Sequence, residues 1–130
     1  MVNNYFHGSP EGNIKVLEPR AITRRSDQTK PRVYASPEIG IAAVMLISWD
    51  DSIASFGRKN NGPWTLEILE KGKFKDTDGW IYTLDHKGVI LVEDGELEVY
   101  FEESKQMINK IYVPSALKFA IKHGIEVKYK

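Results

Sequence analysis

Asn4-Tyr5-Phe6-His7-Gly8-Ser9 and Arg32-Val33-Tyr34-Ala35-Ser36 are the two stretches that decide the expected fold. In each, an apolar and aromatic run ends at small and polar residues, which is typical of a strand that enters a tight turn. A binding site could be built where two such strand ends meet. The sequence therefore predicts two short strands with a candidate site at their ends, and the remaining residues are interpreted mainly as scaffold.

The composition fits one domain over residues 1–130. Of the 130 residues, 42% are hydrophobic, which suits a single core. The 18 basic and 18 acidic residues balance to a formal net charge of +0, so the charge does not indicate nucleic acid or a membrane as the main partner. No apolar run reaches the roughly 20 residues of a membrane helix, and residues 1–4 lack the pattern of a signal peptide. We expect a cytoplasmic protein with no membrane partner.

Cysteine is absent, and there are only three histidines, His7, His86 and His123. The lack of cysteine excludes disulfides, thiolate chemistry and cysteine-based metal sites. The histidines are far apart in sequence and show no metal-ligand spacing, so we expect no bound metal. His86 is expected in a turn and His123 near the end of the last helix, and neither is assigned a catalytic role.

Helix signals follow the second motif. Ser36 suits the N-cap and Pro37 the first position of a helix, which then has Ile39, Ala42, Ala43 and Leu46 at helical spacing. Apolar residues also occupy its other faces, so we expect this helix to be buried on most sides. A second short helix is expected over residues 51–56.

The second half of the chain has the composition of a β-rich segment. Asp94-Gly95 is a strong hairpin signal, and Pro114-Ser115 opens a final helix that Gly124 is well placed to end. Aromatic and branched residues predict strands over residues 64–69, 80–84, 89–92, 97–101, 107–113 and 125–129. Many strands with two or three short helices give an α+β class with mostly antiparallel sheets.

The residue types of the first motif suit contact with a nucleotide. His7 could offer a ring nitrogen to a ribose hydroxyl, and Gly8 would let a ligand approach the backbone closely. The Ser9 hydroxyl adds a further hydrogen bond. The alternative is a simple turn with a half-exposed histidine.

The second motif has a similar pair of interpretations. Tyr34 could present its flat face to a heteroaromatic ring, while the small Ala35 keeps the floor of the site clear. The alternative is an aromatic strand residue followed by Ser36 as a helix cap, and that capping role is compatible with either interpretation.

Together, the two motifs resemble the ADP-ribosyltransferase superfamily, especially the branch of the poly(ADP-ribose) polymerases and the small rifampin ADP-ribosyltransferases. In those proteins a strand ending in His-Gly-Ser or His-Gly-Thr is followed by a strand with Tyr-Phe-Ala-Ser or a close variant, and then by a helix. Tyr5-Phe6-His7-Gly8-Ser9, Val33-Tyr34-Ala35-Ser36 and the Ala42-Ala43 helix occur here in that order. Leu17-Glu18-Pro19 resembles the Leu-x-Pro of the rifampin enzymes. The resemblance covers residues 5–46 and implies split, mostly antiparallel sheets.

The same resemblance implies that the protein binds NAD as a substrate. His7 would hold the adenosine-side ribose, the Gly8 backbone would bind the nicotinamide amide, and Tyr34 would stack on the nicotinamide ring. Ser36 would line this pocket, and Ser9 and Ala35 complete the two binding motifs.

A basic segment separates the two motifs in the sequence. Residues 20–32 could neutralise a pyrophosphate or an anionic substrate, and Arg20 and Arg32 flank the motif strands. The alternative is ordinary solvated loop charge.

The family also uses a carboxylate, usually glutamate, on a later strand, because positive charge develops on the ribose as nicotinamide leaves. Period-two alternation places Glu98, Tyr100 and Glu102 on one face of the strand over residues 97–101 and its end. Glu98 precedes Val99-Tyr100-Phe101 as in the polymerases, with Gln106 at a similar later offset, and Glu102 is the second candidate. The alternative is a solvated acidic strand face.

The expected function is therefore mono-ADP-ribosyl transfer, a glycosyltransferase reaction on NAD that needs no metal. The acceptor stays open among protein, nucleic acid and a small molecule. Two alternatives remain. The first is a non-catalytic nucleotide-binding or regulatory module on the same fold. The second is a macromolecular interaction protein, such as a phage or toxin–antitoxin component.

Overall fold

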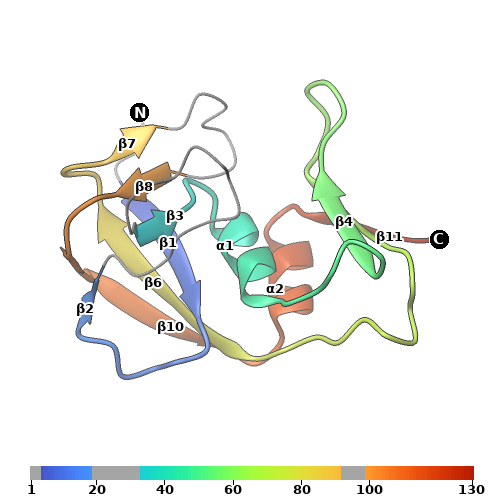
Figure 1. The fold of residues 1–130 in the computed structure, drawn as a ribbon, viewed down its shortest axis with the longest axis horizontal. Helices are drawn as coiled ribbons and strands as arrows, with labels where there is room; N and C mark the ends of the chain where they lie inside the picture. The colour runs from blue at the N-terminus through green and yellow to red at the C-terminus, as the bar shows by residue number, and fades with distance from the viewer. Residues whose placement is uncertain (1–3, 19–32, 92–98) are drawn as a thin grey trace.

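Residues 4–18, 33–91 and 99–130, which a computed structural model of the protein describes, form short strands and two helices (Figure 1). Most strand pairs are antiparallel, which confirms the α+β class. The elements in chain order are β1 (Asn4–Ser9), β2 (Val16–Leu17), β3 (Val33–Ala35), α1 (Ile39–Leu46), β4 (Ala54–Gly57), β5 (Thr65–Ile68), β6 (Gly79–Asp85), β7 (Ile90–Leu91), β8 (Val99–Phe101), β9 (Lys105–Gln106), β10 (Asn109–Val113), α2 (Ala116–Lys122) and β11 (Glu126–Tyr129).

The first motif forms an edge strand of a three-stranded antiparallel sheet in the order β1-β6-β10. His7 lies opposite Tyr82 in this sheet. Successive side chains of a strand point to opposite faces, so Tyr5, His7 and Ser9 share one face of β1. Phe6 and Gly8 share the other.

The second motif lies in a separate three-stranded sheet with the order β3-β8-β7. An isolated bridge joins the two sheets, in which the Phe6 and Ser36 N–H groups each donate to the other residue's carbonyl at 2.8 Å. The sequence motifs are thus adjacent in space, although they are separated by residues 10–32.

Two core clusters lie on the two faces of β1. The helix-side core contains Phe6, the buried residues of α1 and parts of β5, β6 and α2. The second core, called the Tyr5-side core, lies on the opposite face of β1. It contains Tyr5, Leu17, Val33, Ala35, Tyr82, Leu84, Val99 and Phe101. The expected burial of the first helix is confirmed, because residues 40–44 are all buried. β1 is therefore packed on both faces, while Val33 and Ala35 of β3 are buried in the second of these cores.

A third sheet, in the order β11-β5-β4, packs beyond the two helices (Figure 1). Its β11–β5 pair is parallel. The sequence predicts mostly antiparallel strands and does not identify this parallel pair. The connection from β5 to β11 contains most of the second half of the chain, and such crossovers leave no short-range turn signal in the sequence.

The expected helix over residues 51–56 is wrong. A single turn closes where the Ala54 N–H donates to the Asp50 carbonyl, and the Ser52 N–H donates to the Asp50 carboxylate at 2.9 Å. The chain then extends into β4, with Phe56 opposite Leu66 in β5. Pairing with β5 therefore overrides the local helix signal.

Ser36 is not the N-cap of α1, because Glu38 occupies that position. The backbone of Ser36 is held in the bridge to Phe6, and its Oγ accepts the Glu38 N–H at 3.2 Å. The serine therefore stabilises the turn between β3 and α1, two residues before the N-cap.

The predicted ends of the last helix are confirmed. Ser115 is the N-cap of α2 and its side chain accepts the Lys118 N–H at 3.1 Å. Gly124 follows the helix with a φ of +93°, which favours glycine. The Asp94-Gly95 turn lies outside the described residues, but β7 and β8 on either side of it are antiparallel neighbours.

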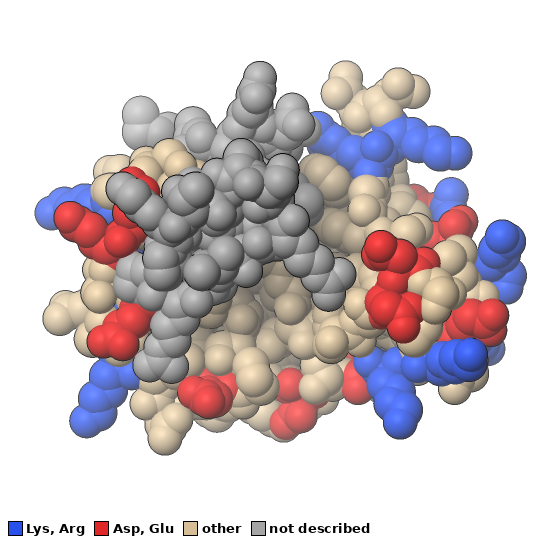
Figure 2. Space-filling view, viewed as in Figure 1, with Lys and Arg blue, Asp and Glu red and all other residues tan. Residues whose placement is uncertain are grey.

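Acidic and basic side chains are interspersed over the face shown in Figure 2. This agrees with the balanced charge of the sequence. Among the described residues, neither helix has the length and apolar character that crossing a bilayer would require.

Candidate functional site

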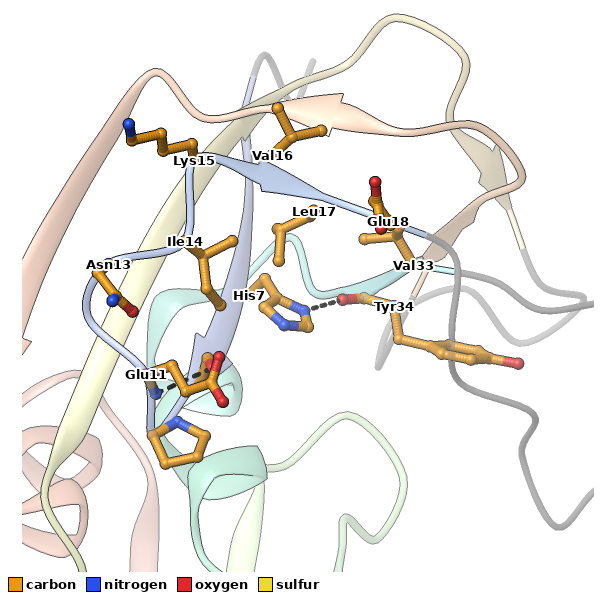
Figure 3. Close-up of a pocket in the computed structure, with 12 residues that line it drawn as sticks. His7, Glu11, Asn13, Ile14, Lys15, Val16, Leu17, Glu18, Val33 and Tyr34 are labelled. Atoms are coloured by element: carbon orange, nitrogen blue, oxygen red, sulfur yellow. Dashed lines mark hydrogen bonds between the residues drawn. The ribbon is translucent and has the colours of Figure 1, made fainter.

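The centre of the candidate site is a hydrogen bond between the two motifs. His7 Nδ1 lies 2.5 Å from the carbonyl oxygen of Tyr34 (Figure 3). A carbonyl only accepts hydrogen bonds, so Nδ1 carries the proton in this contact. The neutral ring is thereby fixed as the tautomer whose Nε2 bears a lone pair. His7 can present an acceptor to a ligand while its other nitrogen holds the two sheets together.

Burial favours the neutral form of His7. Desolvation lowers its pKa from the ordinary 6.5, and the hydrogen bond to Tyr34 offsets part of this effect. At neutral pH the ring is therefore uncharged.

A cavity of about 510 Å³ lies beside His7 (Figure 3). Its volume is within the range of pockets that hold small organic ligands. It is lined by His7, Ser9, Pro10, Glu11, Asn13, Ile14, Lys15, Val16, Leu17, Glu18, Val33 and Tyr34. Both motif strands and the segment between β1 and β2 thus contribute to one hollow.

Tyr82 holds one wall of this cavity in place. Its hydroxyl donates to the Glu11 carbonyl at 2.6 Å and accepts the Ile14 N–H at 3.3 Å. The Ser9 hydroxyl accepts the Glu11 N–H at 3.2 Å, and Lys110 donates to the Gly12 carbonyl. The segment over residues 10–14 is therefore anchored at several backbone atoms, which reduces the cost of ordering it around a ligand. No local sequence signal indicates this role of Tyr82, because its hydrogen-bond partners are about seventy residues away in the chain.

Gly8 has two structural roles. A Cβ at this position would lie 2.5 Å from the Ala42 carbonyl oxygen and 2.9 Å from Leu46 Cγ, so the absence of a side chain lets α1 pack closely on β1. The backbone groups of Phe6 bond to Ser36, on the side of β1 away from β6. Those of Gly8 point to the same side, because strand backbone groups repeat their direction every second residue. The Gly8 N–H and C=O therefore point away from β6, toward the side on which Phe6 bonds to Ser36.

The second motif is brought to the site mainly by its backbone. The Tyr34 carbonyl meets His7, while its ring points away from His7 and lies 6.4 Å from the ring of Tyr100 (Figure 3). Ala35 is fully buried in the Tyr5-side core. The Ser36 side chain is also buried and engaged with Glu38. Tyr34 and His7 are thus adjacent but direct their side chains to different parts of the site.

The candidate carboxylates have different positions. Glu98 and Arg20 lie outside the described residues, as does the rest of the basic segment over residues 20–32. Glu102 is exposed and lines a separate hollow of about 410 Å³ with Lys87 and Lys105. The predicted alternation of this strand is confirmed for Val99 and Phe101, which are buried.

Two glutamates that the sequence analysis did not select line the His7 cavity, Glu11 and Glu18. They flank the ends of β1 and β2, and their proximity to His7 in the sequence was the available signal. Neither follows a strand pattern, because both lie outside β1 and β2.

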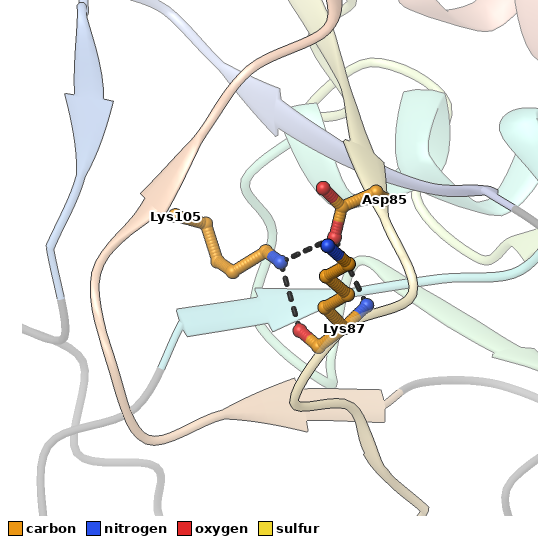
Figure 4. Close-up of polar contacts among 3 residues, drawn as sticks. All are labelled: Asp85, Lys87 and Lys105. Carbon is orange, nitrogen blue, oxygen red and sulfur yellow. Dashed lines mark hydrogen bonds and ion pairs between the residues drawn. The ribbon is translucent and has the colours of Figure 1, made fainter.

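Lys105 connects β9, which pairs with β2 at one wall of the cavity, to the end of β6. Its Nζ donates to Asp85 Oδ1 at 2.6 Å and to the Lys87 carbonyl at 2.8 Å (Figure 4). It also lies 4.8 Å from the centre of the Phe101 ring. In the β2–β9 pair Lys105 lies opposite Leu17, which lines the cavity. This contact links the end of β6 to the wall of the site.

Lys105→Met should lower the free energy of unfolding by about 1–2 kcal/mol, because a charge-assisted hydrogen bond is lost around a side chain that is only 11% exposed. The hydrogen bond from Lys105 lowers the pKa of Asp85 from 3.8, so this stabilisation should fade as pH falls below that value. Urea unfolding measures the change. Lys128→Met is the control, because Lys128 is 61% exposed and 3.5 Å from its partner Glu126. Equal losses in both variants would contradict a special role for Lys105.

Comparisons with protein-family models, with curated proteins and with solved structures found no match to this chain. Interpretation of the site therefore depends on its own residues and geometry. These provide a neutral histidine acceptor, the outer edge of β1, and a cavity with an anchored wall.

Proposed function

We propose that the protein binds NAD where the ends of β1 and β3 meet, cleaves the nicotinamide–ribose bond and transfers ADP-ribose to an acceptor. The observation that supports this most is the direct contact of His7 with Tyr34 beside the cavity. It joins the two motifs whose order in the sequence resembles the ADP-ribosyltransferase superfamily.

Each part of the site has a distinct role in this proposal. His7 Nε2 accepts a hydrogen bond from a ribose hydroxyl. The Gly8 N–H and C=O, at the strand edge, pair with the carbonyl and amino groups of the nicotinamide amide. Tyr34 and Tyr100, whose rings lie 6.4 Å apart, offer aromatic surface to the nicotinamide ring.

The reaction breaks the bond between ribose C1′ and the nicotinamide nitrogen, and the electron pair leaves with nicotinamide. The acceptor's nucleophilic atom then bonds to C1′ and loses its proton. Positive charge builds on the ribose between these events, and a fixed carboxylate lowers its energy. Glu98 and Glu102 are the proposed carboxylates, and holding both substrates in line supplies the remaining acceleration.

Nicotinamide release tests the catalytic part of the proposal. We expect Glu98→Gln or Glu102→Gln to lower the rate about 100-fold or more, as is typical when a group that stabilises transition-state charge is removed. Glu67→Gln makes the same chemical change on an exposed position of β5 and should keep the wild-type rate. Equal rates in all four proteins would eliminate both glutamates as catalytic groups.

A non-catalytic nucleotide-binding module is the second candidate. The observation that favours it is the position of Glu102 in a different hollow from His7. NAD binding without nicotinamide release, in the presence of protein, nucleic acid and small-molecule acceptors, would favour this candidate over the transferase.

A further inference from the structure

The chemistry of the His7 cavity favours one part of a nucleotide over the others. Its neutral histidine presents an acceptor at Nε2, because Nδ1 donates to Tyr34. Glu11 and Glu18 add carboxylates, which accept hydrogen bonds and do not donate them when ionised. A hydroxyl-rich ligand satisfies such groups, because each hydroxyl can donate.

The same lining is unfavourable for phosphate. Lys15 is the one cation among the lining residues of the described chain, and its side chain points away from His7 (Figure 3). Among the described lining residues, a phosphate in this cavity would approach two carboxylates and no facing cation. Like charges that are brought together in a binding site disfavour binding.

Glu11 is the carboxylate best placed to act on a ligand at His7. Its side chain lies on the His7 side of the segment between β1 and β2 (Figure 3). Its backbone is anchored on both sides, by the Ser9 hydroxyl at 3.2 Å and by the Tyr82 hydroxyl at 2.6 Å. The segment cannot withdraw from a charged ligand without breaking these bonds.

We infer that the His7 cavity takes an unphosphorylated ribose, with His7 and Glu11 accepting from its two neighbouring hydroxyls, and that Glu11 makes the protein select NAD over NADP. This inference rests on the proposed function. A carboxylate that binds a ribose diol rejects a 2′-phosphate at the same position in other dinucleotide sites. The anchored Glu11 supplies that group here.

Calorimetric titration of the full chain with NAD, NADP and adenosine tests the inference. Wild-type protein should bind NAD about tenfold or more tightly than NADP, and it should bind adenosine detectably. Glu11→Gln should weaken NAD binding several-fold and bring the NAD and NADP affinities within about threefold of each other. Glu67→Gln should keep the wild-type ratio.

Glu11→Gln should fold normally, because the hydrogen bonds of Glu11 to Ser9 and Tyr82 are made by its backbone. An unchanged Tm checks this. A wild-type NAD-to-NADP ratio near one, or an unchanged ratio in Glu11→Gln, would overturn the inference while leaving NAD binding intact. No binding of NAD by the wild-type protein would overturn the proposed function and the inference together.

Discussion

Gly8→Ala is expected to lower the free energy of unfolding by about 3 kcal/mol and the Tm by about 10 °C. The added Cβ would lie 2.5 Å from the backbone oxygen of Ala42, and a backbone atom cannot move aside as a flexible side chain can. Either α1 must shift from β1 or β1 must distort. Both responses disturb the helix-side core, where Phe6 packs beside Gly8.

Thermal and urea unfolding measure this effect, with Gly72→Ala as the control. A Cβ at Gly72 would meet no atom within 4 Å, so its stability should change by less than about 0.5 kcal/mol. Equal stability of the wild type and Gly8→Ala would show that the close packing of α1 on β1 is wrong.

His7→Ala is expected to weaken NAD binding by about 10- to 100-fold, because a ribose hydroxyl loses its acceptor inside the cavity. With NAD at about 100 times the wild-type Kd, wild-type protein gains about 2.7 kcal/mol of stability. A 100-fold weaker variant gains only about 0.4 kcal/mol at the same concentration. The NAD-dependent rise in Tm should therefore fall to about half if binding is tenfold weaker, and it should almost disappear if binding is 100-fold weaker.

Two further variants separate binding from folding. His7→Asn retains a side-chain N–H for the Tyr34 carbonyl but lacks the acceptor at Nε2, so it should fold and still bind NAD weakly. His86→Ala, at an exposed position between β6 and β7, should keep the full rise. Wild-type NAD affinity in both His7 variants would exclude His7 from the binding site.

The same histidine sets a pH dependence. Burial lowers its pKa below 6.5, so the unfolded chain binds the proton more readily than the folded protein does. The contribution of His7 to stability is therefore complete above about pH 6.5 and is lost as pH falls toward its folded-state pKa. NAD affinity should fall over the same acidic range, because a protonated Nε2 can no longer accept. Glu11, Lys15 and Glu18 also line this cavity, and the fall in affinity should persist in Glu11→Gln because His7 causes it.

The strands and the last helix could be predicted because their signals are local. Alternation identified the buried Val99 and Phe101, and the cap residues Ser115 and Gly124 marked the ends of α2. Such features depend on neighbouring residues only. The order of the two motifs predicts that His7 and Tyr34 lie close together, and a hydrogen bond joins the two residues. That they share a binding site stays a prediction.

The features that the sequence did not predict depend on contacts between residues that are far apart in the chain. The local pattern of residues 51–56 predicts a helix, but residues 54–57 pair with β5 as a strand instead. The local sequence predicts Ser36 as the N-cap of α1. Its bridge to Phe6, which is distant in the sequence, holds its backbone in a sheet contact instead. The anchoring of the cavity wall by Tyr82 and the position of Glu11 also follow from pairing of β1 with β6. The functional roles of Glu98, Glu102 and Arg20 stay predictions.

The most direct test of the account is a histidine ¹⁵N NMR titration with NAD. The chain has three histidines, so His7 can be assigned by comparison with His7→Ala. At about pH 8, we predict the Nδ1-protonated tautomer for His7 in the free protein. Its Nε2 resonance should shift saturably with NAD, while those of His86 and His123 should stay in place. An Nε2-protonated ring, or an unmoved His7 resonance at saturating NAD, would contradict the account.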